Sequence, residues 1–271
     1  MEINFSKLTA AGNDFVLIDN RNNIIPKENY QSLAKKLCDR KYSIGADGLI
    51  LLENSQNKDF KMKYFNSDGS CACMCGNGGR SVTKFAYDLG IVDSKMIFET
   101  DAGVVNAEVL AQDRVRLSLY APKDLKQNIK LQVEGKTFNS DFINTGVPHV
   151  VIFVDDIESV DVFKYGRLIR HNKTFSPQGA NVNFVQVLEG NRLLVRTYER
   201  GVEDETLACG TGITASGIVS ALKGFTKSPV SIVSRGGDEL SVSFDVDSNL
   251  QINNVVLEGP TIISFKGIIN I

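Results

Sequence analysis

The stretches Met74-Cys75-Gly76-Asn77-Gly78-Gly79 and Ala208-Cys209-Gly210-Thr211-Gly212-Ile213 decide the fold of this chain. Each places a cysteine before a glycine-rich turn, and the second cysteine follows the first by 134 residues. The same spacing relates other parts of the chain: Gly12 to Gly146, Gly45-Ala46-Asp47 to Gly179-Ala180-Asn181, Tyr64 to Tyr198, Gly90 to Gly224 and Gly103 to Gly237. A spacing kept over most of a chain indicates a duplicated unit. We therefore expect two related halves whose equivalent turns face each other across a cleft, and the two thiols are the first candidates for function.

Short runs rich in β-branched and aromatic residues recur in both halves and predict strands. They lie at 15–19, 49–53, 60–66, 95–100, 104–110 and 114–120, and again at 150–155, 182–188, 192–199, 230–234, 239–245 and 251–257. Amphipathic helices are predicted at 29–39 and 162–171. A second helix follows each Cys-Gly turn and ends at Gly90 or Gly224, where glycine suits the residue after a helix. These later helices are apolar nearly all round, which is typical of buried helices. The sequence thus predicts an α+β fold of two pseudo-symmetric halves, each a curved sheet around a central helix.

The division between the halves is predicted near Ala121-Pro122-Lys123. Segment 129–133 precedes the strand at 137–144, whereas nothing precedes the equivalent strand at the N-terminus. Segment 261–267 is left over at the other end, so we expect it to return and complete the first sheet. The predicted domains are residues 1–121 with 262–271, and residues 122–261.

Composition excludes several classes of function. The formal charge of −2, with both signs interspersed, argues against a nucleic-acid surface. The chain contains no run of five or more basic residues, so a polybasic membrane-binding patch is not expected either. The apolar runs are too short to span a bilayer, and no signal peptide is visible. Five cysteines form an odd number in a chain of ordinary size, which fits a reducing cytoplasm better than a disulfide framework.

The two Cys-Gly turns also carry the predicted chemistry. A free thiol has a pKa of about 8.5, and a helix N-terminus contributes only about 0.3–1 kcal/mol toward ionising it. One thiolate facing one thiol is therefore the expected state, and it suits an enzyme that removes a proton from one face of a carbon and delivers another to the opposite face. The turn glycines can aim backbone N–H groups at a carboxylate. The alternative is that the turns only cap buried helices, with each thiol as a small hydrophobe; the equal spacing of the two turns favours the chemical interpretation.

At this level of detail the chain resembles the diaminopimelate epimerases, from about residue 3 to residue 266. The segments that carry the resemblance are Gly12-Asn13-Asp14-Phe15, Asn66-Ser67-Asp68-Gly69-Ser70, Met74-Cys75-Gly76-Asn77-Gly78, Tyr198-Glu199-Arg200-Gly201 and Glu205-Thr206-Leu207-Ala208-Cys209-Gly210-Thr211-Gly212. The resemblance implies a cofactor-independent isomerase that interconverts LL- and meso-2,6-diaminopimelate on the route to lysine and peptidoglycan. It also implies two β-barrels, each around a central helix, and assembly as a homodimer.

Residue roles follow from the same resemblance. Cys75 and Cys209 would be the acid and base. The substrate would be bound by Asn13, Asn66, Asn77, Asn181, Glu199 and Arg200 and by the backbone of Gly76, Gly210 and Thr211. His149 and Glu199 would give electrostatic support. The chain departs from the family at Val147, where many members carry asparagine, and at Ser67, which replaces alanine.

Two other functions stay open at this stage. Val147 leaves room for a racemase of another amino acid, such as histidine, on the same fold. Cys71-Ala72-Cys73-Met74-Cys75 also allows a thiol redox or metal-binding protein, although structural zinc prefers a different spacing and the chain has only two histidines. We expect no metal, with Cys71 and Cys73 in a loop, Cys38 in the core and His171 on the surface. Asp47 and Asp68 are interpreted as turn and loop formers rather than acids.

Overall fold

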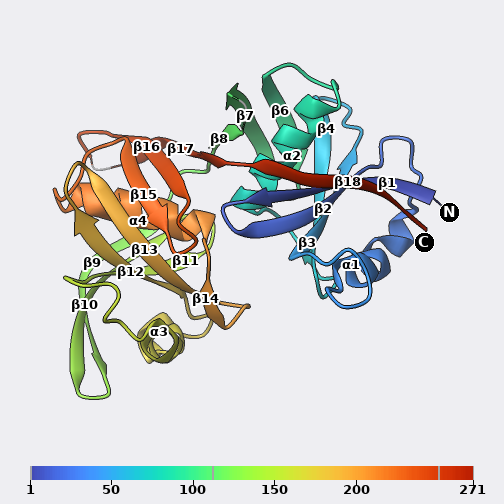
Figure 1. The fold of residues 1–271 in the computed structure, drawn as a ribbon. Helices are drawn as coiled ribbons and strands as arrows, with labels where there is room; N and C mark the ends of the chain where they lie inside the picture. Colours follow the sequence, from blue (N-terminus) through green and yellow to red (C-terminus); the bar gives the residue numbers. More distant parts are fainter. Residues whose placement is uncertain (1, 112, 250, 271) are drawn as a thin grey trace. The chain divides into compact units, whose positions relative to one another are not determined.

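The computed structural model describes residues 2–111, 113–249 and 251–270 (Figure 1). Met1 and Ile271, which end the predicted first domain, lie outside the described residues, as do Gln112 and Leu250. The chain divides into two compact units. The first comprises Met1–Ser118 and Glu258–Ile271, and the second comprises Leu119–Leu257.

The first unit is a mixed sheet. Its strands are β1 (Glu2–Ala10), β2 (Asn13–Asp19), β3 (Gly48–Glu53), β4 (Phe60–Asn66), β5 (Cys71–Ala72), β6 (Lys95–Thr100), β7 (Gly103–Ala111), β8 (Arg114–Ser118) and β18 (Ile262–Asn270). β2 runs parallel to β3 and β4 to β6, while the pairs β1–β2, β3–β4, β4–β5, β6–β7 and β7–β8 are antiparallel. The C-terminal strand β18 returns beside β1, antiparallel to it (Figure 1). The leftover C-terminal segment therefore completes the first sheet, as its position in the repeat predicts.

The second unit repeats this order of pairings. Its strands are β9 (Lys123–Val133), β10 (Lys136–Asn144), β11 (Pro148–Phe153), β12 (Asn181–Leu188), β13 (Arg192–Glu199), β14 (Asp204–Thr206), β15 (Val230–Ser234), β16 (Glu239–Val246) and β17 (Ile252–Pro260), the last of which runs across the division at Leu257. β11 is parallel to β12 and β13 to β15; β9–β10, β10–β11, β12–β13, β13–β14 and β15–β16 are antiparallel. β9 pairs antiparallel with β10, just as β18 pairs antiparallel with β1 in the first unit. The duplication and the α+β class are confirmed.

A central helix follows the cysteine turn in each unit: α2 (Gly76–Asp88) and α4 (Gly210–Leu222). α2 contacts β1–β4, β7 and β8, and α4 contacts β10–β13, β15 and β16, so sheet strands surround both. Their buried serines and threonines return hydrogen bonds to carbonyls four residues earlier, as Thr83 does to Gly79 and Ser216 to Gly212. These bonds explain how polar side chains are accommodated where the helices are buried.

Both central helices end on a glycine in the left-handed region. Gly90 has φ +67° and Gly224 has φ +75°. The amide after each glycine bonds back across the last turn, from Ile91 to Ala86 and from Phe225 to Ser220. This arrangement satisfies carbonyls at the helix end that would otherwise lack a donor, and its left-handed backbone favours glycine.

The other two helices pack outside the sheets. α1 (Tyr30–Cys38), preceded by a 3-10 turn at Lys27–Asn29, packs against the buried side chains of β2 and β3. α3 (Val162–Arg170), followed by a 3-10 turn at Lys173–Phe175, does the same with β12 and β13. The short strands β5 and β14 are not among the predicted strands. The assignment of Cys71 to a loop is wrong, because Cys71 belongs to β5 and pairs with Phe65 of β4. No helix in the described residues is long and apolar enough to cross a membrane.

Candidate active site

Cys75 occupies the N-cap of α2. Its backbone is extended, with φ −139° and ψ 124°, and its sulfur accepts the backbone N–H of Gly78 at 3.4 Å. The half-buried sulfur thus lies at the positive end of the helix. Gly78 and Gly79 have a packing role as well: a Cβ on Gly79 would lie 2.8 Å from Leu117 Cδ1 and 2.9 Å from Met74 Cε.

Cys209 occupies the equivalent N-cap of α4. It is 6% exposed, and its sulfur lies 3.5 Å from the Thr211 hydroxyl oxygen. Its carbonyl accepts the N–H of Ile213, which starts the helix. Gly212 allows a neighbouring side chain to approach this turn, since a Cβ there would be 2.3 Å from Asn183 Oδ1.

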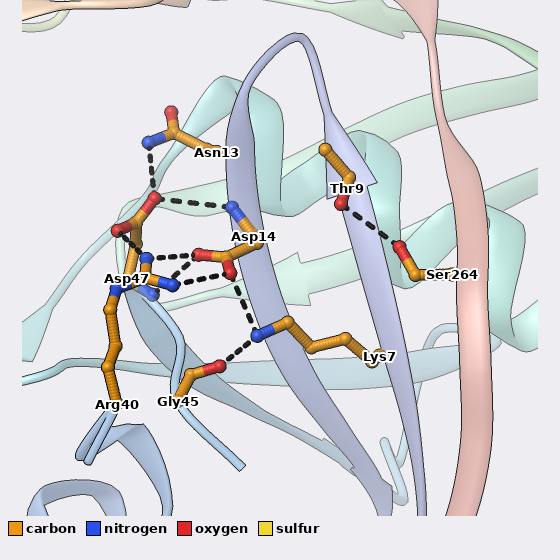
Figure 2. A network of polar contacts seen from close by, with 8 residues as sticks. All are labelled: Lys7, Thr9, Asn13, Asp14, Arg40, Gly45, Asp47 and Ser264. Carbon is orange, nitrogen blue, oxygen red and sulfur yellow. Dashed lines mark hydrogen bonds and ion pairs between the residues drawn. The ribbon is translucent and has the colours of Figure 1, made fainter.

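A charged cluster fixes the Gly12-Asn13-Asp14 turn of the first unit (Figure 2). Arg40 donates to both carboxylate oxygens of Asp14, at 2.9 and 2.7 Å, and to Asp47 at 2.8 Å. Lys7 pairs with Asp14 at 2.8 Å and donates to the carbonyl of Gly45. Burial alone would raise the pKa of Asp14, but hydrogen bonds and charges from Arg40 and Lys7 outweigh it and lower that pKa to about 2.

Asp47 connects this cluster to two of the predicted substrate residues. Its Oδ2 accepts from the amide nitrogen of Asn13 at 3.0 Å (Figure 2). The amide oxygen of Asn13 accepts from Asn77, and Asn77 Oδ1 accepts from Arg80 at 2.8 Å. The two amides are thus aligned head to tail between a carboxylate and a guanidinium, which fixes the direction of each. Asp47 is more than the turn former that the sequence suggested.

Asn66, also predicted to bind substrate, lies at the end of β4, paired with Gly48 of β3. Its Nδ2 donates to the hydroxyl of Ser70 at 2.9 Å within the tight turn that joins β4 to β5. Its backbone closes the same turn, because its N–H donates to the carbonyl of Ser70.

The second unit gathers His149, Asn181, Thr211 and Cys209. His149 is fully buried, and burial, followed by the charge of Arg200, lowers its pKa to about 3, so the ring is neutral. Its Nε2 lies 2.9 Å from the Thr211 hydroxyl. Asn181 Oδ1 accepts the backbone N–H of Arg200 at 2.7 Å, which fixes the start of the loop after β13.

The acids near Arg200 have other partners. Glu203 pairs with Arg170 at 3.0 Å, and Glu205 pairs with Arg196 at 2.6 Å. Among the residues that the structure describes, the guanidinium of Arg200 donates to the carbonyl of Gln178, at 3.5 Å. Glu199 accepts from the Thr206 hydroxyl at 3.1 Å. Arg200 is therefore not held in an ion pair with the acids that follow it.

Cys38, Cys73 and His171 lie where the sequence predicts, whereas Cys71 lies in β5. Cys38 is buried against α1 neighbours, and burial raises its pKa to about 12. Cys73 is exposed, and His171 has a side chain 60% exposed after α3. Within the described residues none of the five cysteines forms a disulfide, and no group of three or more histidine, cysteine or acidic side chains is arranged to hold a metal ion.

Comparison with known proteins shows the family to which the chain is similar. The family model described as diaminopimelate epimerase matches residues 5–120 and 142–261. The diaminopimelate epimerase of Aquifex aeolicus is 47% identical over 97% of this chain and 96% of its own length. That of Hydrogenobaculum sp. is 42% identical over 98% of both chains.

The chain belongs to the diaminopimelate epimerase family.

It is accordingly an isomerase of the epimerase type. Solved structures of proteins with other names share the fold of this chain. A PhzF-family phenazine biosynthesis protein of Bacillus anthracis superposes with a TM-score of 0.81 at 15% identity, covering 100% of both chains. A probable proline racemase of Agrobacterium radiobacter superposes with a TM-score of 0.75 at 14% identity, covering 99% of this chain and 92% of that one. At such identities the likeness concerns the fold alone.

Proposed function

We propose that this protein interconverts LL- and meso-2,6-diaminopimelate, with Cys75 and Cys209 as the two acid–base groups. One sulfur, as thiolate, removes the proton from the α-carbon on one face, and the other, as thiol, delivers a proton to the opposite face. The first sulfur ends as thiol and the second as thiolate, so each turnover prepares the enzyme for the reverse reaction. The observation that carries the proposal is the pair of equivalent cysteines at the N-termini of two buried helices, in a chain of this family.

We assign the substrate contacts by chemistry. The N-terminal amides of α2 and α4, from Gly76, Gly210 and Thr211, suit a carboxylate next to the reacting carbon. Arg200 suits a carboxylate at the far end, since Glu203 and Glu205 pair with Arg170 and Arg196 instead. The amides of Asn13, Asn66, Asn77 and Asn181 and the carboxylate of Glu199 can hold the ammonium groups and remaining oxygens. His149 and Glu199 provide electrostatic support for the negative charge that passes from one sulfur to the other.

The proposal is tested by removing each thiol separately. Because general acid–base groups typically contribute about 10²–10⁴-fold, Cys75→Ala and Cys209→Ala should each retain about a hundredth or less of wild-type epimerisation. The assay is incorporation of deuterium from ²H₂O into product, followed by mass spectrometry from either stereoisomer. Cys73→Ala is the matched control, because Cys73 is exposed on the same loop. Retention of more than about a tenth of the activity by either variant would contradict a two-base mechanism.

The same assay separates the competing functions. A panel containing histidine and proline beside diaminopimelate tests whether Val147 has changed the substrate, and exchange confined to another amino acid would overturn the assignment. Treatment with a chelator tests the metal-binding alternative. We expect epimerisation to persist after metals are removed, because the proposed proton transfer uses only sulfur.

We also infer that the protein works as a homodimer in the cytoplasm. The homodimer rests on the family resemblance, and light scattering coupled to gel filtration measures it directly. The cytoplasm follows from the chemistry, since a thiolate–thiol pair is active only while both sulfurs are reduced. A monomer that retains full activity would contradict the inference on assembly.

A further inference from the structure

A buried row of polar side chains leads to Cys209 within the second unit. It runs from Thr197 on β13 through Asn183 on β12 and His149 on β11 to Thr211 at the start of α4. Asn183 and His149 are fully buried, and Thr197 is 3% exposed. Neither Asn183 nor Thr197 is among the residues that the sequence patterns assign to the site.

The amide of Asn183 can have only one orientation. Its nitrogen lies 2.9 Å from the backbone carbonyl of Val150, which can only accept, so the nitrogen must point there. Its oxygen accepts from the hydroxyl of Thr197 at 2.9 Å, across the antiparallel pair β12–β13. The same amide nitrogen lies 3.1 Å from His149 Nδ1, and its second hydrogen points at that ring nitrogen.

This orientation decides which nitrogen of His149 carries the proton. A neutral imidazole has one donor and one acceptor nitrogen. Because Nδ1 accepts from Asn183, the proton is on Nε2, which lies 2.9 Å from the Thr211 hydroxyl oxygen. The amide nitrogen of Asn181 lies 3.4 Å from the same Nε2, and a nitrogen that bears a hydrogen does not accept from it.

Thr211 connects His149 to the sulfur of Cys209 by hydrogen bonds. Its oxygen accepts from His149, so its single hydroxyl hydrogen is left to point at Cys209 Sγ, 3.5 Å away. Gly212 permits this arrangement, since a Cβ there would lie 2.3 Å from Asn183 Oδ1 and 3.3 Å from His149 Cε1. A second bond, from the Thr145 hydroxyl to the Thr211 carbonyl at 2.9 Å, fixes the backbone of this turn.

The fold itself does not require polar groups at these places. By the 134-residue spacing, His149 and Asn183 correspond to Phe15 and Leu49 in the first half, which are 1% and 0% exposed. Apolar side chains thus fill the equivalent positions of the same architecture. The polar row belongs to the second half, where it ends on a cysteine.

We propose that Asn183 is a positioning residue, which fixes the Nε2-protonated tautomer of His149 so that the Thr211 hydroxyl donates its hydrogen to Cys209. The donated hydrogen bond stabilises the thiolate form of Cys209 over the thiol. The consequence for epimerisation rests on the proposed function, but the tautomer and the state of the sulfur do not.

The first test is nitrogen NMR of protein labelled with ¹⁵N in the imidazole rings. The chain has only two histidines, so His171→Gln assigns both sets of signals without touching the buried row. We expect His149 to be neutral and protonated on Nε2. Asn183→Asp keeps the shape but offers an acceptor, and should move the proton to Nδ1. Protonation of Nδ1 in the wild-type protein would overturn the proposal.

The second test measures the sulfur. Alkylation by iodoacetamide is followed against pH by peptide mass spectrometry, with the exposed Cys73 as internal reference. A hydrogen bond to a charged group contributes about 1.5 kcal/mol or more, so the Cys209 profile should shift upward by about one pH unit in Thr211→Val. Thr211→Ser should restore it, because it retains the hydroxyl. An unchanged profile in Thr211→Val overturns the proposal.

Two further outcomes are decisive in the same way. Asn183→Leu, which copies Leu49 of the first half, should shift the Cys209 profile in the same direction as Thr211→Val, since it removes the donor to His149 Nδ1, leaves the Thr211 hydroxyl in place and adds no charge. A shifted profile without diaminopimelate turnover by the wild type would retain this inference and overturn the proposed function instead.

Discussion

Asp14 offers a test of the charged cluster that supports the first cysteine turn. It accepts from Arg40 and pairs with Lys7, whose side chain is only 7% exposed. Asp14→Asn keeps the shape and an oxygen for the N–H of Asp47 but removes the charge. Lys7 would then be left in a nearly buried position beside a neutral amide.

The expected loss follows from the pKa of Asp14, which falls from 3.8 for an isolated aspartic acid to about 2 in the folded protein. A lowered folded-state pKa means that the charged form stabilises the fold, and one pKa unit corresponds to 1.36 kcal/mol. The contribution is therefore about 2 kcal/mol above pH 4. It is lost as pH falls through the folded pKa, with about half remaining at pH 3 and little below pH 2.

The assay is urea unfolding followed by far-ultraviolet circular dichroism, since the chain contains no tryptophan. At pH 7 the free energy of unfolding of Asp14→Asn should lie about 2 kcal/mol below that of the wild type, and the difference should halve at pH 3. Asp19→Asn is the control, because the Asp19–Arg21 pair has side chains 31% and 36% exposed and should contribute less than about 1 kcal/mol. Equal losses in the two variants, or a difference independent of pH, would refute the reasoning.

Three further outcomes are expected. Asp47→Asn should raise KM for diaminopimelate about tenfold with a smaller change in kcat, because Asn13 loses one hydrogen bond to a charged group; an unchanged KM in steady-state kinetics would exclude this role. Gly212→Ala should lower the melting temperature and the epimerase activity together, because the new Cβ would lie 2.3 Å from Asn183 Oδ1; a variant as active and stable as the wild type would count against the close approach. Arg200→Ala should reduce kcat/KM by at least about 30-fold, from an unpaired substrate carboxylate, and leave the melting temperature unchanged; thermal unfolding and kinetics on one sample show whether the two effects separate.

Local patterns in the sequence were enough for the architecture. The equal spacing of the cysteine turns predicted the duplication, and the run of apolar residues after each cysteine predicted a buried helix. The ends of these helices were also readable, because Gly90 and Gly224 meet a backbone requirement that involves only neighbouring residues. Such features depend on the period and chemistry of adjacent positions, which a sequence displays directly.

Partner side chains were decided only in three dimensions. Asp47 looked like a turn residue, yet Arg40 and Asn13 both bind it, from segments before it in the chain. Asn183 is one of three polar residues in β12, with Asn181 and Gln186, and no motif in the sequence distinguishes it. Its role depends on β12 lying parallel to β11 and antiparallel to β13, which brings His149 and Thr197 to its two ends. Strand order and register set these neighbours, and they follow from packing of the whole sheet rather than from any local stretch of residues.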